Sequence, residues 1–169
     1  MAKRPGALAR LKNIKFLLLD VDGVMTDGGV YFAESGEEMK KFNIQDGYGV
    51  VRLQRAGIAV GIITGRISKL VQRRAQELGI QEVHQNLENK LEAYSHIKKK
   101  LNLKDDQVAY IGDDEPDLPV LKLAAFSAAP ADAVASVKKS VDYLCKRKGG
   151  EGAVREVVDM ILKAKSHVT

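Results

Sequence analysis

The stretch Leu17-Leu18-Leu19-Asp20-Val21-Asp22-Gly23 joins an apolar run directly to two acids that stand two positions apart. The run Phe16 to Leu19 has no polar side chain, which is typical of a parallel strand covered by helices on both faces. Such sheets bind ligands where their strands end, so Asp20 and Asp22 are candidate site residues. Two such acids also open ordinary polar turns. Taken alone, the stretch favours the turn, and partners elsewhere in the chain must decide.

Apolar runs and helical periodicities alternate along the rest of the chain. Predicted strands cover 14–20, 58–63, 83–84, 108–111 and 124–127, and predicted helices cover 50–56, 67–78 and 87–101. After the first strand, the segments 30–32 and 38–42 flank Ser35-Gly36 and predict a β-hairpin. This alternation predicts an α/β fold with a doubly wound parallel sheet and one hairpin excursion.

The length of 169 residues favours one domain. Residues 1–12 show little periodicity and are expected to be a mobile or peripheral lead-in, whereas 13–169 form the domain. Within it, Gly149-Gly150-Glu151-Gly152 predicts a hinge, so that 149–169 form a C-terminal tail and helix. The apolar stripe of this helix favours packing on its own domain over packing on a partner.

Composition narrows the class of protein. Hydrophobic residues make up 45% and charged residues 29%, a globular balance, and the longest uncharged apolar stretch, 58–64, is too short to span a bilayer. Without a recognisable secretory signal, a cytoplasmic location is expected. The net charge of +5 comes without a basic aromatic surface, so a small anion is a better candidate partner than nucleic acid. The single cysteine, Cys145, is expected to be a buried structural thiol.

Polar side chains follow several predicted strand and helix ends. They are Thr64-Gly65-Arg66 after the second strand, Lys90 near a helix start, and Asp113-Asp114 with Asp117 after a later strand. In a parallel sheet these ends converge on one edge, where they would meet Asp20 and Asp22. Crowded carboxylates repel one another, and Mg²⁺ suits a few carboxylates with water and a phosphate. The sequence therefore predicts a magnesium site.

A hydroxyl and an ammonium beside such a cation are what a phosphoryl group requires, because its transfer depends on positioning and on neutralising charge. Thr64 and Lys90 are the candidates. Each has another interpretation: Thr64 as the N-cap of the following helix, and Lys90 as a solvated helix lysine. Their joint occurrence at strand ends favours a phosphate site.

These motifs, in this order, resemble the haloacid dehalogenase superfamily of phosphatases. Asp20-Val21-Asp22-Gly23-Val24 is similar to its nucleophile motif, and Thr64, Lys90 and Gly112-Asp113-Asp114 with Asp117 are similar to its other three. The resemblance implies that Asp20 attacks phosphorus and that Asp22 serves as acid and base. It also implies further roles: Mg²⁺ held by Asp20, the Asp22 backbone carbonyl and Asp113, with Asp114 in support; phosphate held by Thr64, Gly65 and Lys90; and Asp117 orienting Lys90 or bracing the loop.

Many relatives insert a cap domain over the site, but neither gap between motifs has room for one here. The sequence resembles a capless subgroup that acts on phosphorylated eight- and nine-carbon keto sugar acids, in the segments 22–28, 42–47, 63–66 and 149–156. The resemblance implies a homotetramer in which a neighbour's C-terminal tail covers the site. Arg66 would pair with the sugar carboxylate and Arg155 would reach a neighbouring site, although each can also be an ordinary surface or packing residue. An eight-carbon substrate from lipopolysaccharide precursor synthesis is expected, with a nine-carbon, sialic-acid-type substrate as the alternative.

Two other classes of protein gather similar residues. A phosphoaccepting receiver domain has paired acids after its first strand and a lone phosphorylated Asp later, whereas here the Asp20-Val21-Asp22 unit comes first and Asp113-Asp114 comes late. An inactive sugar-phosphate binding module is the other alternative, and the presence of every chemical residue argues against it. The Glu115-Pro116 pair stiffens the last motif, because proline restricts its own backbone and that of the residue before it.

Overall fold

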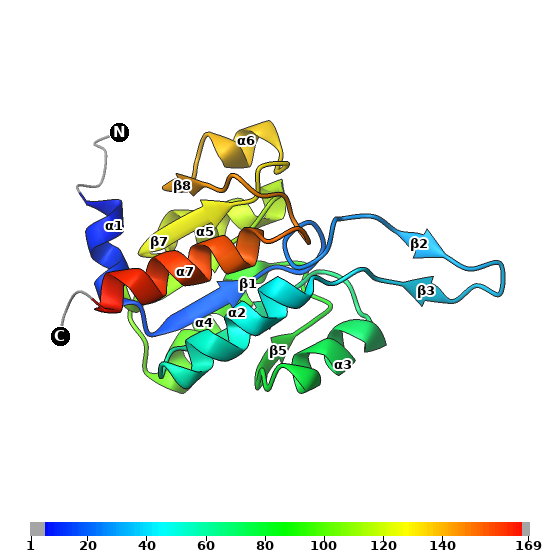
Figure 1. The fold of residues 1–169 in the computed structure, drawn as a ribbon, viewed down its shortest axis with the longest axis horizontal. Coiled ribbons are helices and arrows are strands. Elements are labelled where there is room, and N and C mark those ends of the chain that lie inside the picture. Colours follow the sequence, from blue (N-terminus) through cyan, green and yellow to red (C-terminus); the bar gives the residue numbers. More distant parts are fainter. Residues whose placement is uncertain (1–5, 167–169) are drawn as a thin grey trace.

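The computed structural model describes residues 6–166, so the outermost parts of the expected lead-in (1–5) and tail (167–169) lie outside the described residues. The described residues form a six-stranded parallel sheet in the order β5-β4-β1-β6-β7-β8 (Figure 1). Its strands are β1 (Phe16–Leu19), β4 (Ala59–Ile63), β5 (Glu82–His84), β6 (Val108–Ile111), β7 (Phe126–Ala129) and β8 (Tyr143–Leu144). The predicted doubly wound parallel sheet is confirmed, and β8 is an additional edge strand.

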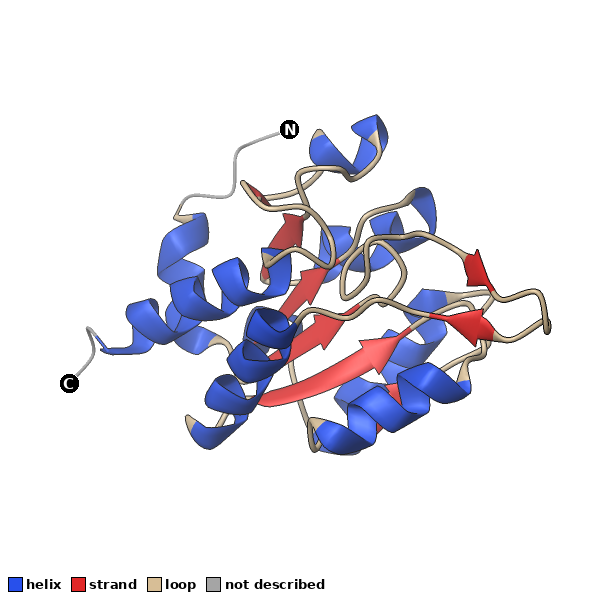
Figure 2. Ribbon diagram, turned by 45° about the vertical axis from the view of Figure 1, so that its right-hand side comes forward, coloured by secondary structure: helices blue, strands red, loops and turns tan. Residues whose placement is uncertain are grey.

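Helices cover both faces of this sheet (Figure 2). The buried residues of α2 (Ile44–Arg55), α3 (Lys69–Glu77) and α7 (Ala153–Ser166) belong to one apolar core, and those of α4 (Lys90–Leu101), α5 (Leu118–Leu123) and α6 (Ala135–Lys138) belong to the other. Strand β1 supplies alternate side chains to both cores: Leu17 and Leu19 to the first, Phe16 and Leu18 to the second. The run therefore has no polar residue because neither of its faces meets water.

Helix α2 begins at Ile44, six residues before the predicted start. Asn43 caps it, accepting hydrogen bonds from the backbone N–H groups of Gln45 at 2.7 Å and Asp46 at 3.2 Å. Glycine inside the first turns hid this start from the sequence prediction. Gly49 is needed there for packing, because a Cβ atom at this position would lie 3.0 Å from Cδ of Arg155 on α7.

The β-hairpin, with β2 (Tyr31–Phe32) and β3 (Glu38–Met39), projects away from the sheet (Figure 1). An isolated antiparallel bridge between Thr26 and Phe42 closes its base. The tip is solvent-exposed, and Phe32 is 66% exposed. The predicted excursion is present, and the described chain has no separate cap domain over the sheet edge.

Two terminal segments pack more closely than the sequence suggested. The described part of the lead-in forms α1 (Ala7–Arg10) and the start of η1 (Leu11–Asn13), with Leu11 buried in the core. At the other end, a Cβ atom on Gly149 would lie 1.8 Å from the carbonyl oxygen of Gly23, so the glycine joint is a close backbone contact. After this joint, the apolar stripe of α7 is buried in the core of its own domain.

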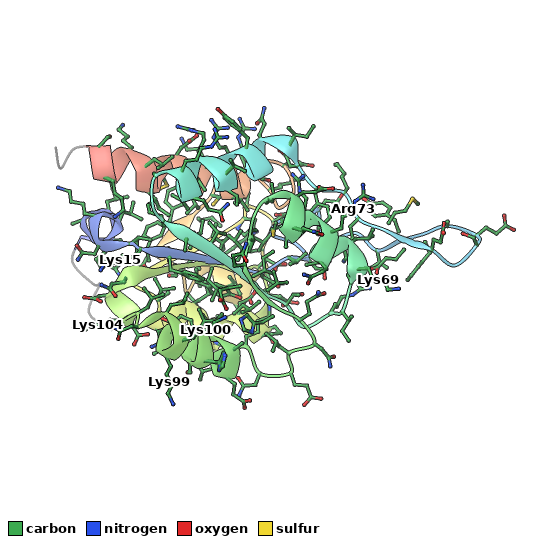
Figure 3. All side chains as sticks on the ribbon, turned by 90° about the horizontal axis from the view of Figure 1, so that it is seen from below. Lys15, Lys69, Arg73, Lys99, Lys100 and Lys104 are labelled. Carbon is green, nitrogen blue, oxygen red and sulfur yellow. The ribbon has the colours of Figure 1, made fainter. Side chains whose placement is uncertain are left out.

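Surface charge is spread over separate elements. Figure 3 labels Lys99 and Lys100 on α4, Lys104 just after it, and Lys69 and Arg73 on α3. All of these residues are solvent-exposed, as expected for charged helix faces. In the part of the chain that the structure describes, no helix is long and apolar enough to cross a bilayer, and Cys145 is a buried free thiol.

Candidate active site

The candidate site lies where the strand order changes direction. From β1 the chain continues to β4 on one side, and β6 later pairs on the other side, with Leu19 opposite both Ile62 and Ile111. A crevice forms at the carboxyl ends of strands at such a switch point. Asp20 follows β1 directly and therefore lies between the ends of β4 and β6.

A cleft of about 360 Å³ opens at this point. The predicted residues that line it are Asp20, Asp22, Thr64, Gly65, Arg66, Lys90, Asp113 and Asp114. Gly23, Gly28, Leu87, Glu88 and Pro116 also line it. The resemblance covered Gly23 and Gly28, and Pro116 was noted for its effect on the backbone, but Leu87 and Glu88 were not singled out from the sequence. The topology thus brings four separate segments to one opening.

Asp117 lies behind the cleft, with no exposed surface. Its Oδ1 accepts hydrogen bonds from Lys90 Nζ at 2.7 Å and from the Tyr110 hydroxyl, and its Oδ2 accepts the backbone N–H groups of Asp113 at 2.9 Å and Asp114 at 3.2 Å. Although its carboxylate lies close to those of Asp20 and Asp113, four donors occupy it. Asp117 therefore braces Lys90 and the loop 112–117, and it is a poor candidate for a metal ligand.

Lys90 is the first residue of α4, which Asn89 caps by accepting the backbone N–H of Leu91 at 3.0 Å. The buried ammonium of Lys90 lies 2.9 Å from Oδ2 of Asp20 as well as against Asp117. Burial alone would lower the lysine pKa, but the two carboxylates outweigh it and raise the pKa of Lys90. A permanently charged ammonium thus faces the cleft.

Asp20 and Asp113 are crowded carboxylates. Burial, followed by the charge of Asp117 and against the opposing effect of Lys90, raises the pKa of Asp20 to about 6. Burial and the charges of Asp20 and Asp117 raise the pKa of Asp113 to about 8. A divalent cation between these groups would stabilise both ionised forms.

The residues present fit a hard cation. Carboxylate oxygens of Asp20 and Asp113 lie within 4.8 Å of each other, and the buried Oδ1 of Asp113 has no hydrogen-bond partner among the described residues. Gly23 leaves room for Asp113, because a Cβ atom there would lie 2.1 Å from its Oδ2. An all-oxygen donor set with a free, buried acceptor is what Mg²⁺ binds.

Thr64 follows β4 and is buried beside the cleft. Its hydroxyl accepts the backbone N–H of Arg66 at a long 3.4 Å. Helix α3 begins only at Lys69, with Ser68 in the N-cap position. Thr64 is therefore not the cap of that helix, and its hydroxyl remains available to a ligand.

The Asp22 side chain contacts the base of the hairpin and does not belong to the close group formed by the carboxylates of Asp20, Asp113 and Asp117. Its Oδ1 accepts a hydrogen bond from the ammonium of Lys40, which also lies 3.5 Å from Oε1 of Glu38. The same Glu38 oxygen accepts a hydrogen bond from Nη2 of Arg66 at 2.8 Å. Sequence reasoning missed Lys40 and Glu38, because the strand pattern of 38–42 does not reveal where the hairpin base folds.

Two predicted residues have other surroundings. Arg155 does not line the cleft of its own chain: its Nε donates to Oδ2 of Asp159 at 2.9 Å, and its guanidinium lies over the ring of Tyr48. It borders a separate, open pocket of about 570 Å³. Pro116 lies in the first turn of η3 (Glu115–Asp117), and the side chain of Asp114 caps this turn. The loop 112–117 therefore accommodates the proline without disruption.

Comparisons with known proteins agree with this geometry. A family model described as haloacid dehalogenase-like hydrolase matches residues 80–157. The 3-deoxy-D-manno-octulosonate 8-phosphate phosphatase of Escherichia coli K12 is 46% identical over 157 residues, which is 93% of this chain and 84% of that protein.

Solved structures give the same result. The crystal structure of this phosphatase from Yersinia pestis matches with a TM-score of 0.94 at 46% identity, over 96% of this chain and 88% of that one. The Moraxella catarrhalis phosphatase, in complex with magnesium ion, phosphate ion and a KDO molecule, matches with a TM-score of 0.94 at 40% identity, over 98% and 95%. The chain belongs to the haloacid dehalogenase-like hydrolases, in the family of the 3-deoxy-D-manno-octulosonate 8-phosphate phosphatases.

Proposed function

We propose that this chain is a Mg²⁺-dependent phosphatase that hydrolyses 3-deoxy-D-manno-octulosonate 8-phosphate, a step in lipopolysaccharide precursor synthesis. The observation that carries the proposal is the meeting of Asp20, Asp113, Lys90 and Thr64 in one cleft at the switch point of the sheet. Relatives that carry the name of this enzyme match over nearly the whole of the present chain. The Moraxella relative was solved with magnesium and with phosphate and KDO, which are the two products of the proposed reaction.

In the first step, a carboxylate oxygen of Asp20 attacks phosphorus and the bond from phosphorus to the sugar oxygen breaks. Lys90, 2.9 Å from Asp20, holds this carboxylate and offsets the charge of the phosphoryl oxygens. The Thr64 hydroxyl and the backbone at Gly65 bind the same oxygens. Bound Mg²⁺, held by Asp20, the Asp22 backbone carbonyl and Asp113 with Asp114 in support, supplies further neutralisation of charge.

Asp22 handles the protons. As the ester bond breaks, its carboxylic acid gives a proton to the leaving sugar oxygen. In the second step it takes a proton from the water that attacks the aspartyl phosphate, which releases inorganic phosphate and regenerates Asp20. Asp22 is the less buried of the two acids, and it contacts Lys40 at the base of the hairpin.

The test is a phosphate-release assay with Mg²⁺ on the eight-carbon sugar acid phosphate. Asp20→Asn, which keeps the shape of the side chain, should lower kcat by more than about 1,000-fold. The variant should keep its circular dichroism spectrum, and chelation of Mg²⁺ should abolish wild-type turnover. Unchanged activity of a folded Asp20→Asn enzyme would rule out the nucleophile assignment.

A nine-carbon sialic-acid-type 9-phosphate is the second candidate substrate, because the cleft has no cap that measures the length of the sugar. Arg66 lines the cleft and is proposed to pair with the carboxylate of either sugar. Comparing kcat/KM for the two acids and for a neutral hexose phosphate separates the possibilities. A preference for the neutral sugar would exclude both acidic substrates.

We further propose a homotetramer, in which hairpins form the contacts and a neighbour's C-terminal tail covers the cleft. Exposed apolar side chains on the hairpin, including Phe32 and Met39, support this arrangement. Arg155, which does not line its own cleft, is proposed to serve the neighbouring site. The single, buried cysteine is compatible with the cytoplasmic location that we also propose.

Sedimentation equilibrium tests the assembly: the wild type should be a tetramer, and Phe32→Glu should dissociate it. Mixing Asp20→Asn subunits with Arg155→Ala subunits should restore some activity if Arg155 acts across subunits. A monomeric wild type with full turnover would overturn the assembly.

A further inference from the structure

A chain of ion pairs runs along the base of the hairpin, and the residues at its two ends line the cleft. It consists of Asp22, Lys40, Glu38 and Arg66, in this order: Lys40 contacts Asp22, Glu38 lies 3.5 Å from Lys40, and Arg66 lies 2.8 Å from Glu38. Asp22 and Arg66 line the cleft, whereas Glu38 belongs to β3 and Lys40 directly follows this strand. The hairpin is therefore linked to the reacting groups by ion pairs.

Lys40 is an unusual lysine, because its side chain is only 2% exposed. Burying an ammonium is costly unless carboxylates surround it, and fixing a flexible side chain costs about 2 kcal/mol of rotamer entropy. The neighbouring Lys41 shows the ordinary arrangement: its side chain is 60% exposed, 3.7 Å from Oδ2 of Asp27. A lysine that merely anchored the hairpin base would be served by a contact of that exposed kind.

The geometry favours one carboxylate for Lys40. Glu38 is its second carboxylate neighbour, at the longer distance of 3.5 Å, and is itself held by Arg66, so the ammonium contacts Asp22 and is braced by Glu38. Through this contact the rotamer of Asp22 is fixed, although Asp22 is one of the more exposed acids of the cleft. An acid that transfers a proton must be held within hydrogen-bond reach of the receiving oxygen.

We propose that Lys40 is a positioning residue for the reaction: braced by Glu38, it holds the Asp22 carboxylate where it meets the leaving oxygen of the substrate. The inference rests on the proposed phosphatase function. It assigns Lys40 no contact with phosphorus or metal. Its effect falls on the step in which the ester bond breaks and the sugar oxygen needs a proton.

Leaving groups separate this role from a structural one. An alkoxide leaves poorly without a proton, whereas p-nitrophenolate leaves as a stabilised anion and depends little on an acid. In single-turnover experiments with Mg²⁺ and enzyme in excess, Lys40→Met should slow cleavage of the sugar-acid phosphate about 10- to 100-fold, part of what general acid catalysis supplies. Release of p-nitrophenolate from p-nitrophenyl phosphate should change less than about threefold, and Lys40→Arg should restore part of the loss.

Lys41→Met is the matched control and should leave both rates as in the wild type. Equal losses of both rates in Lys40→Met, or no loss in either, would overturn the proposal. If Lys40→Met does not fold, Lys40→Arg alone decides, because its displaced charge should still slow the alkyl ester more than the aryl ester. If the wild type rejects the sugar-acid phosphate but cleaves another alkyl phosphate, the proposed substrate fails, and the same comparison on that ester still tests Lys40.

Discussion

Gly23→Ala is the perturbation that tests the metal site most directly. Gly23 has a φ of +84°, and a Cβ atom there would lie 2.1 Å from Oδ2 and 2.6 Å from Cγ of Asp113. Alanine has no alternative side-chain rotamer that could relieve this contact. Asp113 must withdraw by more than about 1 Å, and a displacement of that size is enough to lower an enzymatic rate about 100-fold.

Two measurements follow from this displacement. The Mg²⁺ concentration for half-maximal phosphate release should rise, because Asp113 supplies an acceptor, Oδ1, that has no hydrogen-bond partner among residues 6–166. The free energy of unfolding should fall by about 1–2 kcal/mol, the cost of a left-handed backbone conformation for a residue with Cβ. A Mg²⁺ titration of activity and a urea denaturation curve give the two values.

Gly57→Ala is the matched control. Gly57 has nearly the same φ, +81°, but a Cβ atom there would meet nothing within 4 Å. It should lose a similar amount of stability and keep the wild-type Mg²⁺ titration. If Gly23→Ala also keeps that titration, the contact with Asp113 does not determine metal binding and the reasoning fails.

Three further predictions concern the charges around the cleft. Asp117→Asn should lower the free energy of unfolding by about 3 kcal/mol in urea denaturation, because it removes one partner of the buried pair with Lys90; a loss below about 1 kcal/mol would contradict the bracing role. Glu38→Gln should lower KM for the acidic sugar phosphate up to about fivefold relative to a neutral sugar phosphate, because Arg66 is released from an exposed ion pair worth at most about 1 kcal/mol. An unchanged KM ratio would exclude a competition between Glu38 and the substrate carboxylate for Arg66. Without Mg²⁺, the free energy of unfolding should fall as the pH rises from about 4 to 8, because the raised pKa values of Asp20 and Asp113 make the folded state bind more protons than the unfolded state. The increase in Tm caused by Mg²⁺ should therefore grow over this pH range. An increase in Tm that shrinks with pH would refute this prediction.

The sheet and the order of its motifs were predictable because their determinants are local. A run of four residues buried on both faces can contain no polar side chain, and β1 is such a run. Acids directly after β1 and β6 then had to meet, because parallel strands in register end together. Convergence of Thr64 and Lys90 followed from the same rule.

Other features depend on contacts that periodicity does not encode. The start of α2 was missed because Gly47 and Gly49 weaken the helical pattern, although both lie at tight contacts with side chains of α3 and α7. The proposed roles of Glu38 and Lys40 depend on where the base of the hairpin lies relative to Asp22 and Arg66. In the sequence, Lys40 and Lys41 are adjacent and equivalent, and only the fold buries one of them.

Four acids at or behind the cleft, Asp20, Asp22, Asp113 and Asp117, differ because the donors that face them differ. Asp117 receives four donors and has no free acceptor for a cation. Asp22 accepts a hydrogen bond from Lys40 at the base of the hairpin and is not part of the close carboxylate group. Asp20 faces one ammonium, and Oδ1 of Asp113 has no partner in the described chain. A cation binds where acceptors remain free, so the hydrogen bonds around these acids agree with the proposed division into a brace (Asp117), a proton carrier (Asp22) and two metal ligands (Asp20 and Asp113), of which Asp20, beside the ammonium, is the proposed nucleophile.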